Sequence, residues 1–219
     1  HGEPGDTVID DLHQMPGASW FPDGRVSFAG TILREADDRP AIRARGEHQA
    51  QWRTISRREL HEMVGAAAEA MRQAGVVEGD RVVGYLPNIP ETIVAMLAAS
   101  TLGAIWSSCS PDFGVRGVLD RFERLEPKLL VCCDGYAYGG KRIDCRPRTA
   151  EILEALAKTA ASAPQVVMVP FLDPDATTEV LRDAVRWDDF LQQGEGVPPD
   201  LTPVPVSYTH LRAHETSRY

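Results

Sequence analysis

Cysteine, positive charge and long apolar runs are all scarce in this chain of 219 residues. Four cysteines are too few for a disulfide scaffold, so we expect a reducing compartment and a cytoplasmic location. Lys and Arg number 23 against 32 Asp and Glu, and the net charge of −9 argues against a general binder of nucleic acid or anionic membranes. With 43% hydrophobic and 25% charged residues, the composition is that of a globular protein and argues against wholesale disorder.

The sequence also lacks the patterns that are typical of targeting segments and membrane spans. No charged segment followed by an apolar stretch and a small-residue cleavage site is present, so we expect no secretory signal. Residues 92–111 carry no charge, but serines, threonines and Gly103 interrupt them. An interior helix followed by a strand explains this stretch better than a membrane span.

The last 14 residues differ from the rest of the chain. Residues 206–216 resemble the translation of a transposon-type sequencing adapter, and they follow a proline-rich stretch. We therefore expect residues 206–219 to be a non-native tail. The alternative is a native tail in which His210 and His214 bind a metal, but two ligands do not complete a site, and we predict no metal ligands.

The middle of the chain alternates between helix and strand patterns. Ser56 and Glu59 form a capping box, and apolar residues then recur at helical spacing up to Met71. The pattern predicts strands over residues 81–86, 104–110, 128–133 and 165–172, and further helices over residues 90–102, 115–125 and 149–162. Such alternation predicts an α/β fold, with a parallel or mixed sheet, helices on both faces, and ligands beyond the carboxyl ends of the strands.

The sequence suggests three parts. We expect residues 1–54 to form a loop-rich segment that packs on the core, residues 55–205 to form a partial α/β domain, and residues 206–219 to be the tail. Trp20 and Phe21 stand between turn-forming residues. Because aromatic side chains bury large areas, we expect these two to be buried and to pin the N-terminal segment to the domain.

A glycine-rich segment after the third predicted strand is the strongest candidate binding site. Residues 135–141 match the first seven positions of the phosphate-binding pattern G-x-x-x-x-G-K-[ST]. Arg142 stands at the eighth position without a hydroxyl for magnesium, and Pro147 disfavours the helix that should begin there, so a P-loop NTPase is disfavoured. Gly139 and Gly140 still permit close backbone approach, and Lys141 and Arg142 can meet an anion. The alternative is a solvated turn with exposed cations.

No complete catalytic constellation is present, and we predict no catalytic residue. His61 and Glu62 begin the zinc-protease pattern H-E-x-x-H, but Gly65 stands where the second histidine is required. Cys132 and Cys133 are adjacent on a predicted strand, so their side chains point to opposite faces. Packing therefore explains this cysteine pair better than metal binding.

Three short motifs carry a family resemblance. They are E-G-D-R-V at residues 78–82, Y-L-P-N-I-P-E at residues 85–91, and L-G-A-I-W at residues 102–106. Together they resemble the adenylate-forming acyl-CoA ligases, the AMP-binding superfamily. Residues 107–115, with residues 15–22 and 134–136, are most similar to the acetoacetate–CoA ligase subgroup, because acetyl- and propionyl-CoA synthetases carry a glycine-rich pair where Pro111 and Asp112 stand.

The resemblance implies a fold and an activity. It implies the incomplete N-terminal part of a large AMP-binding α/β domain, over about residues 7–191. Such enzymes use ATP and Mg²⁺ to convert a carboxylate to an acyl-adenylate with release of pyrophosphate. The acyl group then passes to the thiol of CoA, and AMP is the good leaving group. For this chain the implied substrates are acetoacetate, CoA and ATP. The family's ATP-phosphate loop, T-S-G-T-T-G-x-P-K, does not occur in the sequence, so we expect the chain alone to be inactive.

The resemblance also gives the glycine-rich segment a role. In related acetyl-CoA synthetases a short R-x-G-R turn contacts CoA phosphates, and residues 138–141 occupy the matching place. Tyr138 replaces the first cation, and Arg142 compensates for it. The implied CoA-binding residues are therefore Gly139, Gly140, Lys141 and Arg142. Two other readings stay open, a different short-chain acyl-CoA synthetase of the acetyl or propionyl type and a non-catalytic α/β binding domain.

Overall fold

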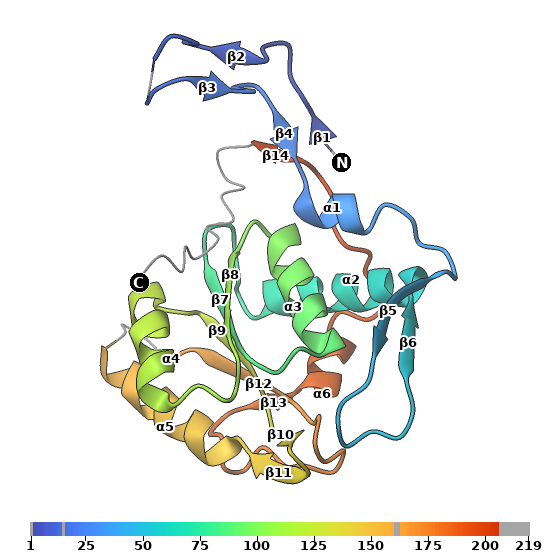
Figure 1. Ribbon diagram of the computed structural model, residues 1–219, viewed down its shortest axis with the longest axis vertical. Helices are drawn as coiled ribbons and strands as arrows, with labels where there is room; N and C mark the ends of the chain where they lie inside the picture. The colour runs from blue at the N-terminus through green and yellow to red at the C-terminus, as the bar shows by residue number, and fades with distance from the viewer. Residues whose placement is uncertain (1, 15, 160–162, 206–219) are drawn as a thin grey trace. The chain divides into compact units, whose positions relative to one another are not determined.

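The computed structural model describes residues 2–14, 16–159 and 163–205 (Figure 1). The described residues fall into two compact units, one built from residues up to Arg34 and from Leu201 onward, the other from Glu35–Asp200. The tail, with His210 and His214, lies outside the described residues. The sequence-based division after residue 54 falls inside β6 (Arg53–Ser56), whose antiparallel partner is β5 (Pro40–Ala44). Because β5 and β6 share one ladder, residues 35–54 group with the larger unit.

The smaller unit consists of short strands and one helical turn. Its strands are β1 (Gly2–Glu3), β2 (Ile9–Asp10), β3 (Ser19–Trp20), β4 (Arg25–Val26) and β14 (Val204–Pro205), and its helix is α1 (Phe28–Ile32). The prediction that Trp20 and Phe21 are buried is wrong, because their exposed fractions are 62% and 39%. The reason is that, among the described strands, β2 and β3 pair only with each other, and a two-stranded ribbon by itself leaves its side chains uncovered.

The larger unit is built on a five-stranded sheet. Its strand order is β13 (Val185–Arg186), β12 (Gln165–Val169), β9 (Leu129–Cys133), β7 (Arg81–Tyr85) and β8 (Ile105–Cys109). All four neighbouring pairs are parallel. Of the two predicted alternatives, a parallel or a mixed sheet, the parallel one is confirmed, and the four predicted strands are present as β7, β8, β9 and β12.

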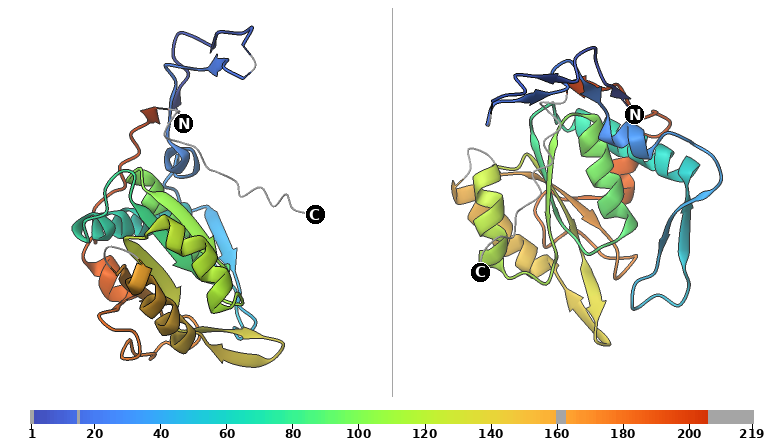
Figure 2. Two further views of the ribbon diagram at one scale, coloured as in Figure 1. Left: turned by 90° about the vertical axis from the view of Figure 1, so that its left-hand side faces the viewer. Right: turned by 45° about the horizontal axis from the view of Figure 1, so that its top comes forward.

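Helices cover both faces of this sheet, as predicted (Figures 1 and 2). One face carries α2 (Arg57–Gln73), α3 (Pro90–Thr101) and α6 (Trp187–Gln192), and the other carries α4 (Val115–Phe122) and α5 (Arg146–Thr159). Alternate strand residues, among them Tyr85, Cys132 and Met168, form one core with Phe122 and Leu156 on the α4–α5 face. Cys133, the next residue on β9, is also buried and points to the opposite face.

The helix boundaries follow local signals. The Ser56 hydroxyl accepts a hydrogen bond from the Glu59 amide at 3.1 Å, and the Glu59 carboxylate accepts one from the Ser56 amide at 2.7 Å, so the predicted capping box is confirmed. Helix α5 begins three residues earlier than predicted, because Pro147 stands in its first turn, where proline is tolerated. The predicted end of this helix at Ser162 lies outside the described residues.

The uncharged stretch over residues 92–111 folds as helix and then strand, as predicted. It contains most of α3 and all of β8. Within the described part of the chain, no helix combines the length and the apolar character that crossing a membrane requires.

Candidate functional site

The loops that follow the parallel strands meet at one edge of the sheet. Because β7, β8, β9 and β12 are parallel, their carboxyl ends point the same way, and the segments after them lie near one another. These segments are residues 86–89, 110–114, 134–145 and 170–173. The third of them contains the glycine-rich segment that the sequence singles out.

This glycine-rich segment is a β-hairpin. Strand β10 (Gly135–Tyr138) pairs antiparallel with β11 (Lys141–Asp144), and Tyr138 stands opposite Lys141. Gly139 and Gly140 form the two-residue turn, with φ angles of 57° and 73°. A turn with both central φ angles positive favours glycine, which has no Cβ to clash. Strand β11 follows the turn where a P-loop requires a helix, so the hairpin is not a P-loop. The argument from Pro147 is wrong, however, because Pro147 stands in the first turn of α5.

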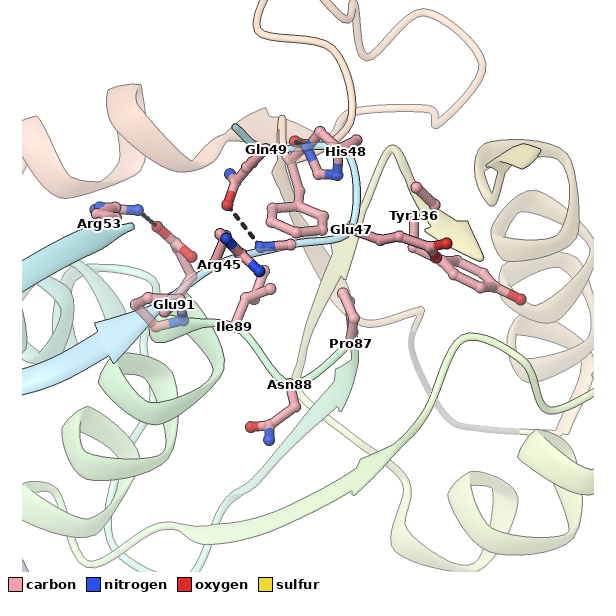
Figure 3. A pocket seen from close by; sticks show the side chains of 15 residues that line it. Arg45, Glu47, His48, Gln49, Arg53, Pro87, Asn88, Ile89, Glu91 and Tyr136 are labelled. Carbon is pink, nitrogen blue, oxygen red and sulfur yellow. Dashed lines mark hydrogen bonds and ion pairs between the residues drawn. The ribbon is translucent and has the colours of Figure 1, made fainter. Parts of the chain in front are cut away.

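The turn of the hairpin binds a carboxylate. The amides of Gly139 and Gly140 donate to Oε2 and Oε1 of Glu47, each across 3.1 Å. Figure 3 shows the Glu47 side chain extending from the loop between β5 and β6 toward the hairpin that carries Tyr136. Glu47 carries no signal in the sequence, because 92 residues separate it from Gly139 and no motif links the two.

The two predicted cations lie on different sides of β11. Lys141 is exposed, and its side chain makes no hydrogen bond or ion pair with any described residue. Arg142 instead donates from Nη2 to the carbonyl oxygen of Leu172 across 2.7 Å. Because consecutive strand residues point to opposite faces, Lys141 and Arg142 do not converge on one ligand. Lys141 thus follows the Gly139–Gly140 turn directly at the start of β11, and the Arg142 guanidinium lies at the loop after β12.

The base of the hairpin is held by a buried carboxylate. Asp134, only 3% exposed, accepts hydrogen bonds from the amides of Phe171 and Leu172 at Oδ1, across 2.7 and 2.9 Å. Its Oδ2 accepts from the Asp173 amide across 2.7 Å. Three backbone donors thus fasten the end of β9 to the loop after β12. At the next residue, a Cβ on Gly135 would collide with the carbonyl oxygen of Ile143 across the hairpin.

The loop after β8 is fixed by donors from β7 and α5. The Tyr85 hydroxyl lies 2.9 Å from the carbonyl oxygen of Pro111 and 2.8 Å from that of Phe113. Arg148 also donates to the Pro111 oxygen, across 2.9 Å. Burial raises the pKa of Tyr85, which keeps the phenol protonated as a donor.

A cavity of about 150 Å³ lies beside the hairpin (Figure 3). Its wall includes Glu47 and Tyr136, together with the buried carboxylate of Glu91, which pairs with Arg53. The His48 ring also lines it and contacts the Phe171 carbonyl oxygen through Nε2 at 3.1 Å. This contact connects the loop between β5 and β6 to the loop after β12.

The cysteines have packing roles. All four are free and buried. Burial raises the pKa of the Cys132 thiol, which disfavours the thiolate needed for nucleophilic or metal chemistry. Among the described residues, no group of three or more His, Cys, Asp and Glu side chains is arranged to hold a metal ion.

Comparisons with known proteins place this geometry in a family. Residues 31–209 match the family described as AMP-binding enzyme. The acetoacetyl-coenzyme A synthetase of Rhizobium meliloti (strain 1021) is 40% identical over 190 residues, which is 87% of this chain and 28% of that protein. The acetoacetyl-CoA synthetase of Mus musculus is 38% identical over 210 residues, covering 94% of this chain and 31% of that protein.

A solved structure shows the same likeness. The acetoacetyl-CoA synthetase from Streptomyces lividans superposes with a TM-score of 0.78 at 38% identity, over 91% of this chain and 30% of that one. The chain thus spans less than a third of the length of these relatives. Because the family match extends over most of the 219 residues, this chain belongs to the AMP-binding enzyme family.

Proposed function

We propose that this chain is part of an ATP-dependent acid–thiol ligase that joins acetoacetate to CoA through an acyl-adenylate. Membership of the AMP-binding enzyme family supports the reaction class, and the similarity to acetoacetyl-CoA synthetases supports the acid. Within this enzyme, the β10–β11 hairpin receives a phosphate of CoA.

One observation carries the assignment of the hairpin. The adjacent amides of Gly139 and Gly140 converge on the two oxygens of a single carboxylate. A phosphate is also an anion that accepts hydrogen bonds through several oxygens, so two adjacent amides that fit a carboxylate also fit a phosphate. The exposed Lys141 stands next to this pair, where its ammonium can neutralise a phosphate as a point charge.

Arg142 has a different part in this proposal. Its guanidinium donates to the Leu172 carbonyl oxygen, and the neighbouring Asp134 carboxylate binds three amides of the same loop. Both contacts fix the hairpin to the loop after β12, at the carboxyl edge of the sheet. Arg142 is therefore a positioning residue, and Lys141 supplies the charge that meets CoA.

The ATP step requires residues beyond these 219. Binding of the triphosphate needs a loop of converging amides and hydroxyls, and the sequence contains no T-S-G-T-T-G-x-P-K segment. We infer that ATP and Mg²⁺ are held elsewhere in the intact enzyme, and that the present chain alone does not turn over. ATP and Mg²⁺ would make the acid reactive, and the residues described here would bind and orient CoA.

A cytoplasmic location is also part of the proposal. All four cysteines are unpaired and buried, which suits a reducing compartment.

The test of the CoA site uses the full-length protein with Lys141→Ala. We expect the KM for CoA to rise about fivefold, because an exposed ion pair contributes at most about 1 kcal/mol. ATP–pyrophosphate exchange should change far less, because it precedes CoA binding. Lys158→Ala, which removes an exposed lysine at the end of α5, is the matched control and should leave both values unchanged. An unchanged KM for CoA in Lys141→Ala would reject the site.

The acid is tested separately by ATP–pyrophosphate exchange with the unmodified full-length protein. Exchange should be fastest with acetoacetate. Faster exchange with acetate or propionate would assign the protein to another short-chain acyl-CoA synthetase. No exchange with any of these acids would favour a non-catalytic binding domain.

A further inference from the structure

The hairpin turn is already occupied by a side chain of the protein itself. Glu47 places one oxygen on the Gly139 amide and the other on the Gly140 amide, each across 3.1 Å. These are the same two amides that the proposed function gives to a phosphate of CoA. The carboxylate is therefore a stand-in for the phosphate, supplied by the loop between β5 and β6.

The Glu47 carboxylate and a phosphate of CoA cannot bind the amides of Gly139 and Gly140 at the same time. An amide carries one hydrogen, so it cannot make a full hydrogen bond to Glu47 and to a phosphate at the same time. In addition, the carboxylate and the phosphate are both negatively charged, so a phosphate that approaches while Glu47 is in place is repelled. CoA can use the amides only after the Glu47 side chain has moved away.

The structure allows that movement without unfolding the loop. Glu47 is exposed, and its two bonds to the hairpin are the only ones it makes among the described residues. The loop backbone is held independently of Glu47. The backbone amide of Gly46 donates to the side-chain oxygen of Gln49 across 2.8 Å, and the backbone amide of Gln49 donates to the carbonyl oxygen of Gly46 across 3.0 Å. The His48 ring anchors the same loop to Phe171. Rotation of one side chain is therefore sufficient to free the turn.

We propose that Glu47 is an internal competitor that sets the affinity of the hairpin for CoA phosphate. The inference rests on the proposed function of the hairpin. When a site is open for only a fraction of the time, its apparent dissociation constant is the intrinsic constant divided by that fraction. Glu47 thus weakens CoA binding and keeps the turn ordered while CoA is absent.

The experiment compares Glu47→Gln with the unmodified full-length protein. Glutamine keeps the size of the side chain but loses the negative charge and one of the two acceptor oxygens. We expect the KM for CoA to fall about two- to tenfold, the range that corresponds to the net contribution of one or two exposed hydrogen bonds. Glu179→Gln makes the same charge change at an exposed residue outside the site and should leave the KM for CoA unchanged.

The direction of the change in the KM for CoA decides whether Glu47 competes with CoA or supports its binding. A rise in the KM for CoA would show that Glu47 holds the hairpin in its binding position, and an unchanged KM would show that it does not compete. Either result overturns the inference. Glu47→Ala is the second variant, and it should lower the KM for CoA in the same way if the protein retains its melting temperature.

Lys141→Ala separates this inference from the proposed function. If Lys141→Ala raises the KM for CoA and Glu47→Gln does not lower it, the hairpin is the CoA site and only the competitor role is wrong. If neither variant changes the KM for CoA, the assignment of the hairpin itself is wrong, and the inference falls with it.

Discussion

The Tyr85 hydroxyl and the Arg148 guanidinium lie at the same distance, 2.9 Å, from one acceptor, the carbonyl oxygen of Pro111. Tyr85 ends β7 and Arg148 stands in the first turn of α5, so this oxygen joins the sheet to a helix on one of its faces. A hydroxyl has a single proton. Because Arg148 donates a hydrogen bond to the Pro111 oxygen, the single proton of Tyr85 is available to the carbonyl oxygen of Phe113, which lies 2.8 Å away. The loop after β8 is fixed by this pair of donors.

The first prediction concerns Tyr85→Phe. The change keeps the buried ring but removes the proton, so a carbonyl oxygen of the loop loses its donor. We expect a loss of about 1–3 kcal/mol in the free energy of unfolding, measured by urea denaturation of the full-length protein. Tyr138→Phe is the control, because Tyr138 is 74% exposed and its hydroxyl can bond to water. Equal effects of the two variants would contradict the role given to Tyr85.

The second prediction concerns Gly135→Ala. An added Cβ would collide with the carbonyl oxygen of Ile143 and lie 2.8 Å from Cδ2 of Leu172, so the hairpin must separate to admit it. We expect a loss of about 1–3 kcal/mol in the free energy of unfolding, as for other overpacked sites. Gly114→Ala is the control, because no atom lies within 4 Å of its Cβ position and its φ is −69°. A stable Gly135→Ala protein with unchanged affinity for CoA would show that the hairpin tolerates this opening.

The third prediction concerns Asp134→Asn. Asparagine can still accept at one oxygen from Phe171 and Leu172, but its amide nitrogen would face the amide of Asp173, and two donors repel. We expect a loss of about 1–3 kcal/mol in the free energy of unfolding. Chemical denaturation measures this, with Asp120→Asn on the exposed side of α4 as the control. A result within error of the control would mean that the loop after β12 does not depend on Asp134.

The fourth prediction concerns acid stability at Asp144. Arg146 donates to this carboxylate through its side chain and its backbone amide, and these bonds hold the pKa of Asp144 below its usual value of 3.8. Because the folded-state pKa is the lower one, the stabilisation is complete above pH 3.8 and is lost as the pH falls through the folded-state pKa. Asp144→Asn should therefore be less stable than the unmodified protein near pH 7, and the difference should shrink below pH 3.8.

Thermal unfolding between pH 2 and pH 7 measures this difference. Arg146→Gln is the companion variant. It removes the guanidinium but keeps the backbone amide that donates to Asp144, so it should reproduce part of the loss near neutral pH. A difference between Asp144→Asn and the unmodified protein that stays constant down to pH 2 would contradict the ion pair's contribution.

Local sequence signals were sufficient for most of the larger unit. The capping box at Ser56 and the proline at the start of α3 depend on neighbouring residues, and the short apolar strands are marked by local runs of apolar residues. Each of these elements appears where the sequence predicts it. The exposed Trp20 shows the limit of this reasoning. An aromatic residue indicates burial only where a second layer exists to cover it, and β2 and β3 form a ribbon without one.

The sequence by itself determined the α/β class, a parallel or mixed sheet with helices on both faces, and the family, because periodicity and motifs are properties of neighbouring residues. Only the tertiary structure decided which groups meet at the hairpin. It brought Glu47 onto the amides of Gly139 and Gly140 across 92 residues of sequence, and it turned Arg142 away from Lys141. The physical reason is that these contacts depend on where separate loops end at the edge of the sheet, which no local pattern encodes.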